Sequence, residues 1–236
     1  MQINANFLER AAVHSRQLAW VPSPSPGVER RMLDRIGAEL ARATSIVRYA
    51  AGCRFAPHTH HGGEEYLVLE GVFSDESGDY AAGTYVRNPP TTSHTPSSVG
   101  GCTIFVKLWQ FDPVDRTPVR IDTTTTPYLP APGRPGVASM ALFQDAHEAV
   151  RLERWAPGAQ IVLAVTGGIE ILVLDGDFVE QDEGFVAGSW LRLPDGASLK
   201  ARAGTEGTRV WIKTGHLAVL RAPQGPRGSA QSAVLP

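Results

Sequence analysis

The sequence predicts an all-β protein made of two tandem barrels of the same kind. Three observations support this prediction: short strand-like runs bounded by glycine, proline and Asp-Gly turns, an internal repeat of about 105 residues, and a histidine cluster on one strand-like run. The chain of 236 residues is long enough for two compact β domains, and its apolar fraction of 42% is enough to build a core in each.

The internal repeat aligns two parts of the chain without a gap over most of its length. Residues 62–71, GGEEYLVLEG, match residues 167–176, GGIEILVLDG, at an offset of 105. Residues 83–89 match residues 188–194 at the same offset, which becomes 106 at both ends of the repeat. A repeat of this length indicates a duplicated domain, so we expect two barrels with one topology.

Composition suggests where the barrels begin and end. We expect a first barrel over residues 17–111, a linker rich in proline and threonine over 112–136 and a second barrel over 137–220. Residues 221–236 should form a flexible tail or an arm that crosses to the other domain. Residues 6–18 are open to two interpretations, because they could form one or two helical turns or an arm that reaches a partner subunit.

Side chains of the types that bind metals gather in the first repeat. His58 and His60 are two residues apart, so on an extended chain both side chains leave the same face, and Glu64 lies on that face at even spacing. His94 follows a Pro-Pro sequence that ends another strand. Imidazole and carboxylate together suit one divalent Zn, Fe, Mn, Ni or Cu ion, and the sequence does not choose among them.

The two segments resemble the paired motifs of the cupin superfamily, G-x5-H-x-H-x3-E-x6-G and G-x5-P-x-G-x2-H-x3-N. The first motif matches throughout, whereas in the second Thr91 replaces the glycine and Ser98 replaces the asparagine. More narrowly, residues 17–111 are similar to the cupin domain of ChrR-type anti-sigma factors. This resemblance implies double-stranded β-helix (jelly-roll) barrels. Cupin barrels often pair into dimers, so the resemblance also implies a homodimer as one possible assembly. It also implies one metal ion held by His58, His60, Glu64 and His94.

The second repeat distinguishes two neighbouring glutamates. Glu65 persists as Glu170, whereas Glu64 is replaced by Ile169. We therefore assign the metal carboxylate to Glu64, and we assign Glu65 to a structural contact on the outer face that both barrels need.

The other ligand positions are also apolar or unsuited to metal in the second repeat. Leu199 replaces His94, and the remaining two histidine positions fall among residues 163–166, which read LAVT. These replacements predict a degenerate second barrel filled with hydrocarbon, because an empty polar socket would be costly. Lys107 persists as Lys213, which favours a shared structural role.

Tyr66 is the candidate catalytic residue. Strand parity places it on the same face as Glu64, and the metal-free repeat has Ile171 at this position. The exchange favours a polar role, such as donating a hydrogen bond to an oxygen ligand beside the ion. An aromatic core residue is the equal alternative.

The remaining polar residues near the motif are expected to have ordinary roles. Odd spacing turns His61 away from the ligand face, so it should lie at the surface or behind the ligands. Cys53 and Cys102 form no C-x-x-C pair and should be buried, while a redox-sensing role for Cys53 stays open. A solvated hairpin loop is expected for the acidic residues Glu70, Asp75, Glu76 and Asp79.

Charge and hydropathy argue against several classes of partner. The net charge is −2 and the 22 basic residues form no stripe, so we expect no nucleic-acid partner. No apolar run approaches the roughly 20 residues of a membrane span, and the N-terminus lacks a basic-then-apolar signal pattern. We expect a cytoplasmic protein with no membrane contact.

Two classes of function fit the predicted site. Three histidines and one glutamate leave one or two coordination positions, so Fe(II) could bind dioxygen and a chelating ketone or diketone, as in cupin dioxygenases. The alternative is a metal-dependent sensor like the ChrR-type regulators, but those carry a zinc-binding helical domain that this N-terminus lacks. An intact ligand set argues against a merely structural protein. We therefore expect a small-molecule metalloenzyme of dioxygenase type.

Overall fold

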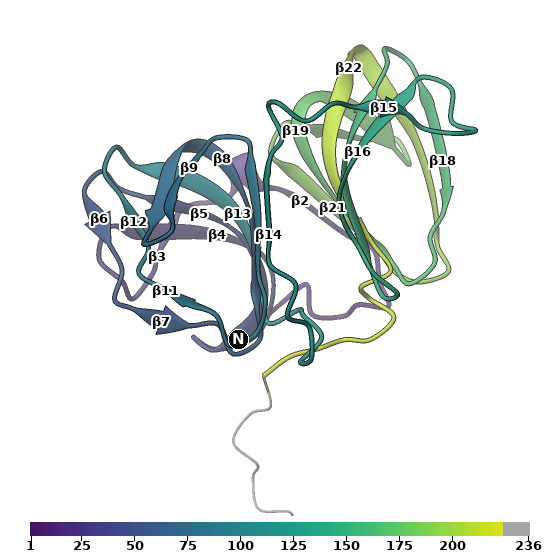
Figure 1. The fold of residues 1–236 in the computed structure, drawn as a ribbon. Coiled ribbons are helices and arrows are strands. Elements are labelled where there is room, and N and C mark those ends of the chain that lie inside the picture. Colours follow the sequence, from purple (N-terminus) through teal and green to yellow (C-terminus); the bar gives the residue numbers. More distant parts are fainter. Residues whose placement is uncertain (224–236) are drawn as a thin grey trace, which may run out of the picture.

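The computed structural model describes residues 1–223 and consists of two β-barrels that lie side by side (Figure 1). Its strands are paired antiparallel, and the described residues contain one short 3-10 turn, η1 (Ser15–Gln17). The predicted all-β class with two tandem barrels is confirmed. Most of the predicted tail, residues 224–236, lies outside the described residues. No helix in the described part is long and apolar enough to span a membrane.

The first barrel has a main sheet in the order β4-β5-β13-β8-β10. A smaller layer formed by β6, β12, β9 and the second half of β8, together with the pair β7-β11, covers its other side. The strands are β3 (Val21–Pro22), β4 (Val28–Gly37), β5 (Ala41–Tyr49), β6 (Cys53–Arg54), β7 (His58–Thr59), β8 (Glu64–Asp75), β9 (Gly78–Ala81), β10 (Thr84–Asn88), β11 (Ser93–His94), β12 (Ser97–Ser98) and β13 (Cys102–Leu108).

The second barrel repeats this arrangement in the order β16-β17-β22-β19-β21. Register shifts within the β19-β22 ladder let these two long strands bend and take part in both layers. The strands are β16 (Val137–Gln144), β17 (Ala149–Trp155), β18 (Gln160–Ala164), β19 (Ile169–Glu180), β20 (Glu183–Val186), β21 (Ser189–Leu193) and β22 (Ser198–Thr214).

In each barrel a glycine lies where one long strand, β8 or β19, passes from the main sheet to the smaller layer. Gly71, the last residue of the first motif, has φ 71°, and its repeat equivalent Gly176 has φ 69°. A Cβ atom would lie 2.1 Å from the carbonyl oxygen of Gly101 at the first position and 2.1 Å from that of Gly207 at the second. Only glycine fits this backbone, which explains why the motif ends on it.

Each repeat gives its opening strand to the other barrel. β2 (Ala11–His14) pairs with β21 of the second barrel, and β14 (Val119–Asp122) pairs with β10 of the first (Figure 1). The segment 6–18 is therefore a strand followed by η1, with no α-helical turn, and it contacts the second barrel of its own chain. Residues 112–136 contain β14 and also β15 (Leu129–Pro130), which pairs with β16.

Two buried ion pairs cross between the barrels. Lys213 Nζ lies 2.6 Å from Glu65 Oε2, and Lys107 Nζ contacts Glu170 Oε2, with all four side chains at most 2% exposed. Since Glu170 and Lys213 are the repeat equivalents of Glu65 and Lys107, the two pairs are related by an approximate two-fold axis. The predicted structural roles of Glu65 and Lys107 are confirmed. The outer face on which Glu65 lies is the interface between the two barrels, which we call the seam.

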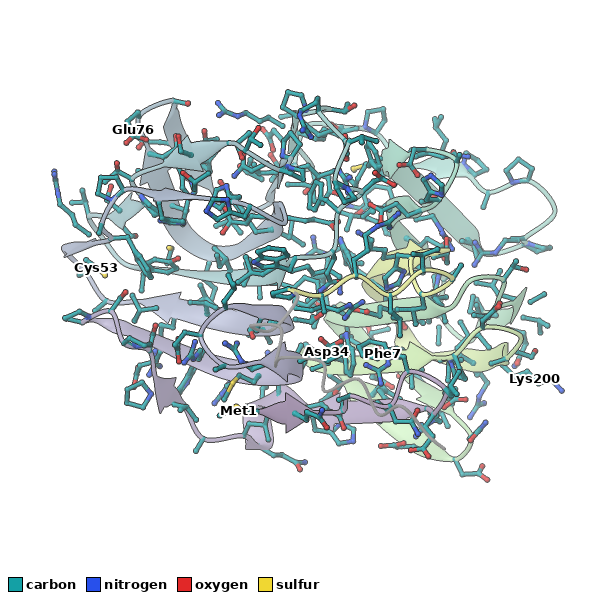
Figure 2. The ribbon with its side chains drawn as sticks, turned by 90° about the horizontal axis from the view of Figure 1, so that it is seen from below. Met1, Phe7, Asp34, Cys53, Glu76 and Lys200 are labelled. Carbon is teal, nitrogen blue, oxygen red and sulfur yellow. The ribbon has the colours of Figure 1, made fainter. Side chains whose placement is uncertain are left out.

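The N-terminal segment also closes over this seam. Asp34 is fully buried, with its carboxylate oxygens 3.3 Å from the Arg192 guanidinium and 3.6 Å from that of Arg42. Both guanidinium groups stack on the Phe7 ring, at 3.9 and 4.3 Å from its centroid. Figure 2 shows Asp34 and Phe7 together near the centre, where the barrels meet. An apolar cluster with members from both barrels continues the seam.

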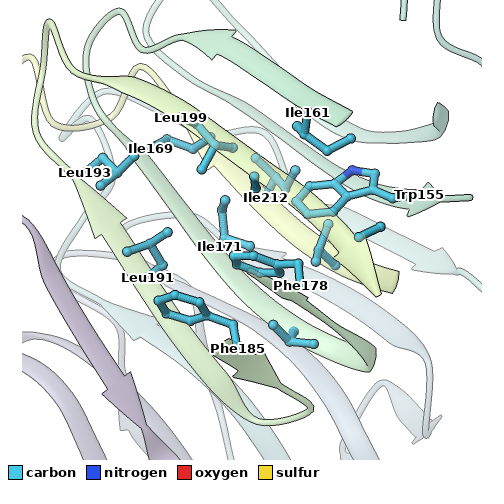
Figure 3. Close-up of a cluster of buried hydrophobic side chains, with 14 of the residues drawn as sticks. Trp155, Ile161, Ile169, Ile171, Phe178, Phe185, Leu191, Leu193, Leu199 and Ile212 are labelled. Atoms are coloured by element: carbon cyan, nitrogen blue, oxygen red, sulfur yellow. The ribbon is translucent and has the colours of Figure 1, made fainter. Parts of the chain in front are cut away.

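The interior of the second barrel is filled by apolar side chains (Figure 3). Strand pairing sets Leu199 opposite Leu163, just as it sets two of the histidines opposite each other in the first barrel. Val165 then takes the place of the remaining histidine. Val165 is 3% exposed, and Ile169 and Leu199 are fully buried. Hydrocarbon therefore occupies the positions where the first barrel carries polar side chains.

Candidate metal centre

Four side chains of the first barrel converge on one point. His58 in β7 and His94 in β11 lie opposite each other in a two-stranded ladder, His60 follows β7, and Glu64 is the first residue of β8. His60, Glu64 and His94 are buried and His58 is half-buried. One donor atom from each residue lies within 4.8 Å of all the others. The structure thus brings together all four residues that the sequence singled out.

His60 lies at the centre of the cluster. Its Nε2 atom is 3.2 Å from Nε2 of His58, 3.1 Å from Nε2 of His94 and 3.4 Å from Oε2 of Glu64. Glu64 Oε2 is 3.6 Å from His94 Nε2. Ligand atoms about 2.1 Å from a shared ion stand roughly 3.0 to 3.4 Å apart for angles near 90° to 109°. The spacing of the donor atoms therefore fits a single ion.

The second ring nitrogen of each histidine faces an acceptor. His58 Nδ1 is 3.2 Å from the carbonyl oxygen of Ala56. His60 Nδ1 is 3.1 Å from Thr92 Oγ1, whose own hydrogen is donated to the carbonyl oxygen of Pro89, so the hydroxyl can only accept. These contacts place the imidazole proton on Nδ1 and leave the Nε2 lone pair directed at the cluster.

Asp75 fixes the third histidine, and sequence reasoning missed this role. His94 Nδ1 is 3.1 Å from the Asp75 carboxylate, which also accepts a hydrogen bond of 3.0 Å from the Tyr80 hydroxyl. The prediction of a solvated hairpin loop is wrong for Asp75, because its side chain is 4% exposed and turns back into the barrel. Glu76 remains exposed but accepts a hydrogen bond from the backbone N–H of Thr95, next to the histidine.

The cluster has the electronic character of a cation site. Burial lowers the pKa of His60, an effect only partly opposed by the charge of Glu64, so the ring is neutral near pH 7. Three Nε2 lone pairs and a carboxylate that converge in this way repel one another unless a cation lies between them. The donor set matches a divalent transition metal, and the acceptors behind the rings match the support that metal-bound histidines usually have.

A cavity of about 380 Å³ opens beside the cluster. Its size lies in the range of small-molecule sites. At its rim Arg30 forms an ion pair of 3.0 Å with Glu39. The apolar and aromatic walls are formed by Val47, Tyr49, Phe55, Ile104, Val106, Leu108 and Trp109.

Tyr66 lies in the barrel interior but does not line this cavity. Its ring is 4.9 Å from that of Phe73 and 6.3 Å from that of Tyr80. The hydroxyl is buried without a hydrogen-bond partner among residues 1–223. Burial, and then the charge of Glu64, raises the pKa of the phenol well above its ordinary value, so it keeps its proton. A catalytic role for Tyr66 stays a prediction. His61 is exposed, as expected.

The two cysteines lie outside the ligand cluster. Cys53 and Cys102 are free and buried, as expected. Burial raises the pKa of both thiols, which argues against a reactive thiolate.

Solved structures with this fold were found at low sequence identity. One is a Nostoc punctiforme protein provisionally described as a dioxygenase, with a TM-score of 0.74 and 14% identity over 93% of this chain and 88% of that one. The Escherichia coli pirin YhhW, solved with nickel(II), has a TM-score of 0.63 and 14% identity over 88% and 99%. An oxalate decarboxylase has a TM-score of 0.61 and 11% identity over 87% and 77%. Such identities establish the fold alone.

Sequence comparison identifies the family. No curated protein sequence matches this chain. The family model described as the ChrR cupin-like domain matches residues 8–112 and again residues 116–218, so it covers both repeats. The chain therefore belongs to the ChrR cupin-like family as a bicupin, and its first barrel carries a cluster of three histidines and one glutamate that could bind a metal.

Proposed function

We propose that this bicupin is a metalloenzyme that acts on a small molecule, with one divalent ion held by the four clustered residues of the first barrel. The observation that carries this proposal is the cavity of about 380 Å³ beside the cluster. A structural zinc site has four protein ligands and needs no room for another, whereas a catalytic ion needs space for substrate. We further propose that the reaction is of the dioxygenase type.

In this proposal the ion and the protein side chains would have different roles. Bound Fe(II) would supply the sites for dioxygen and for a chelating ketone or diketone oxygen. The apolar walls would hold the hydrocarbon part of the substrate and exclude water. Asp75 and Thr92 would keep two of the imidazole rings in the orientation and tautomer described above. Tyr66 would be a hydrogen-bond donor, because its buried hydroxyl has no partner among residues 1–223 and leaving such a group unpaired costs about 1–3 kcal/mol.

The fold relatives are compatible with this chemistry. Their descriptions name a dioxygenase, a nickel complex and an oxalate decarboxylase, although each description applies to that protein alone. A metal-dependent sensor or regulatory protein is the second candidate, and the match of both repeats to the ChrR cupin-like family favours it. In that case the ion would hold the barrel in a partner-binding or ligand-binding state without turnover.

Metal analysis and oxygen uptake together decide between the two candidates. The protein is purified without added metal, its metals are quantified, and dioxygen consumption is followed with a panel of 1,3-diketones. About one iron per chain with substrate-dependent uptake supports the enzyme. Stoichiometric zinc without uptake, even after exchange for Fe(II), overturns it and supports the sensor. His60→Ala should abolish both signals, and the exposed neighbour variant His61→Ala is the matched control for metal content.

A further inference from the structure

A second cavity lies in the seam between the barrels, separate from the one beside the histidines. Its volume is about 260 Å³, and none of its lining residues lines the metal-side cavity. The first barrel contributes side chains from β4, β5 and β8, and the second from β17, β19 and β22. The apolar part of its lining includes Ile46, Leu67, Leu152 and Leu172.

Four arginines line this seam cavity. Arg31 and Arg48 each lie with the guanidinium carbon 4.3 Å from the centre of the Trp20 ring, so the indole holds two cations near each other. Arg16 comes from η1, and Arg209 comes from β22 of the second barrel. Burial, followed by the charges of Arg48 and Arg16, lowers the pKa of Arg31.

Among the described residues, an ion pair with a protein carboxylate neutralises one of these four arginines. Arg48 is paired with Glu29 at 2.6 Å, but among residues 1–223 no ion pair involves Arg16, Arg31 or Arg209. Within the described part of the chain, the one acceptor that Arg31 reaches is the carbonyl oxygen of Leu18, at 2.8 Å. Glu70 is the single carboxylate that residues 1–223 contribute to the lining. Asp175 lies opposite Arg209 in the strand ladder without forming an ion pair with it.

We infer that the seam cavity is a second binding site, for a small organic carboxylate with an apolar body about the size of one ring. The guanidinium groups supply planar pairs of N–H donors, which match a carboxylate. The leucine and isoleucine side chains supply a surface for hydrocarbon, which a bare inorganic anion would not use. The volume is slightly below that of drug-sized sites, so only a small ligand fits.

The proposed site contacts both barrels, and on the first barrel it contacts the strand that carries Glu64. Leu67 lies on β8 between Tyr66 and Val68, whose side chains belong to the core cluster inside the first barrel. A ligand in the seam would therefore touch the back of the strand that begins with Glu64, while Arg209 would hold it from the second barrel.

Calorimetric titration of metal-free protein with benzoate tests this inference, because removal of metal excludes binding of benzoate to an ion. We expect saturable binding that weakens about tenfold in Arg31→Gln and in Arg209→Gln, since each variant loses one charge-assisted hydrogen bond. Benzamide and inorganic phosphate should bind more weakly than benzoate, and added salt should weaken the benzoate complex. Arg202→Gln, at an exposed position on the same strand as Arg209, is the matched control.

Each result of the titration either supports or contradicts the inference. The inference would be overturned if benzoate showed no saturable binding, or if both seam variants bound benzoate as tightly as the unmodified protein. Benzamide binding as tightly as benzoate would overturn it as well. Phosphate binding as tightly as benzoate would contradict the apolar part of the ligand. The two variants lie in different barrels, so a folding defect in one leaves the other informative, and thermal melts verify that each is folded. The result does not depend on whether the metal centre is catalytic.

Discussion

Replacing Glu65 by glutamine tests whether the crossed ion pairs hold the barrels together. The carboxylate accepts hydrogen bonds from Lys213 at 2.6 Å and from the Tyr85 hydroxyl at 2.8 Å, and Arg87 lies 3.7 Å away. Burial alone would raise the pKa of Glu65, but Lys213 and Arg87 more than offset this and hold the pKa below its ordinary value. Glutamine removes the charge, and Glu148, at 2.9 Å, is then the remaining ion-pair partner of Lys213 among the described residues. Breaking a buried pair costs about 3–5 kcal/mol, and the remaining partner places our expectation near 3 kcal/mol.

Denaturant unfolding and thermal melting of the metal-free protein measure this loss. At about 2–4 °C per kcal/mol for a chain of this size, the melting temperature should fall by roughly 6–12 °C. Because the folded pKa is depressed, the contribution of Glu65 is present above its unfolded pKa and is lost as the pH falls through its folded pKa. Metal content should stay intact in Glu65→Gln, whereas the neighbouring variant Glu64→Gln should lose metal affinity. The opposite pattern, loss of metal with unchanged stability in Glu65→Gln, would refute the assignment of the two glutamates.

Three further predictions concern the first barrel and one buried histidine. Elemental analysis should find one ion per chain, none in His60→Ala and nearly one in His61→Ala; two ions per chain would contradict the hydrocarbon-filled second barrel. Asp75→Asn should weaken metal binding about 10–100-fold in a competition assay with a chelator, because it supports a ligand ring from behind. Burial lowers the pKa of His216 to about 4, so the free energy of unfolding should fall by about 3 kcal/mol as the pH drops from about 6.5 to about 4. His216→Gln should flatten that part of the stability profile, and an unchanged slope would count against the buried neutral ring.

The candidate metal cluster was predictable because two independent patterns agree on it. Alternation along an extended chain puts His58, His60 and Glu64 on one face, and the repeat shows which neighbouring glutamate changes when the ligands are lost. The same comparison identified Glu65 and Lys107 as structural. Persistence in both repeats could not show that each of them pairs with the other barrel, because that depends on how the barrels pack.

Asp75 escaped prediction for a physical reason. The register shift between Val68 and Glu70 changes which residues of β8 point inward, so simple alternation from Glu64 fails before Asp75 is reached. An acidic residue beside Ser-Gly turn residues also has the composition of a solvated loop. The seam cavity was equally hidden, since its arginines come from elements that are distant in the sequence, such as η1 and β22.

The exchange of opening strands has a consequence for biosynthesis. Ala11 pairs with Arg192, so β2 leaves the ribosome about 180 residues before the strand it must join. At about 5–20 residues per second, its backbone donors and acceptors wait roughly 10–40 s for a partner. The opposite exchange is quick, because β14 follows its partner β10 by only a few dozen residues. Nascent chains arrested before residue 189 should therefore expose β2 to proteases and chaperones, and release of β21 should remove that exposure.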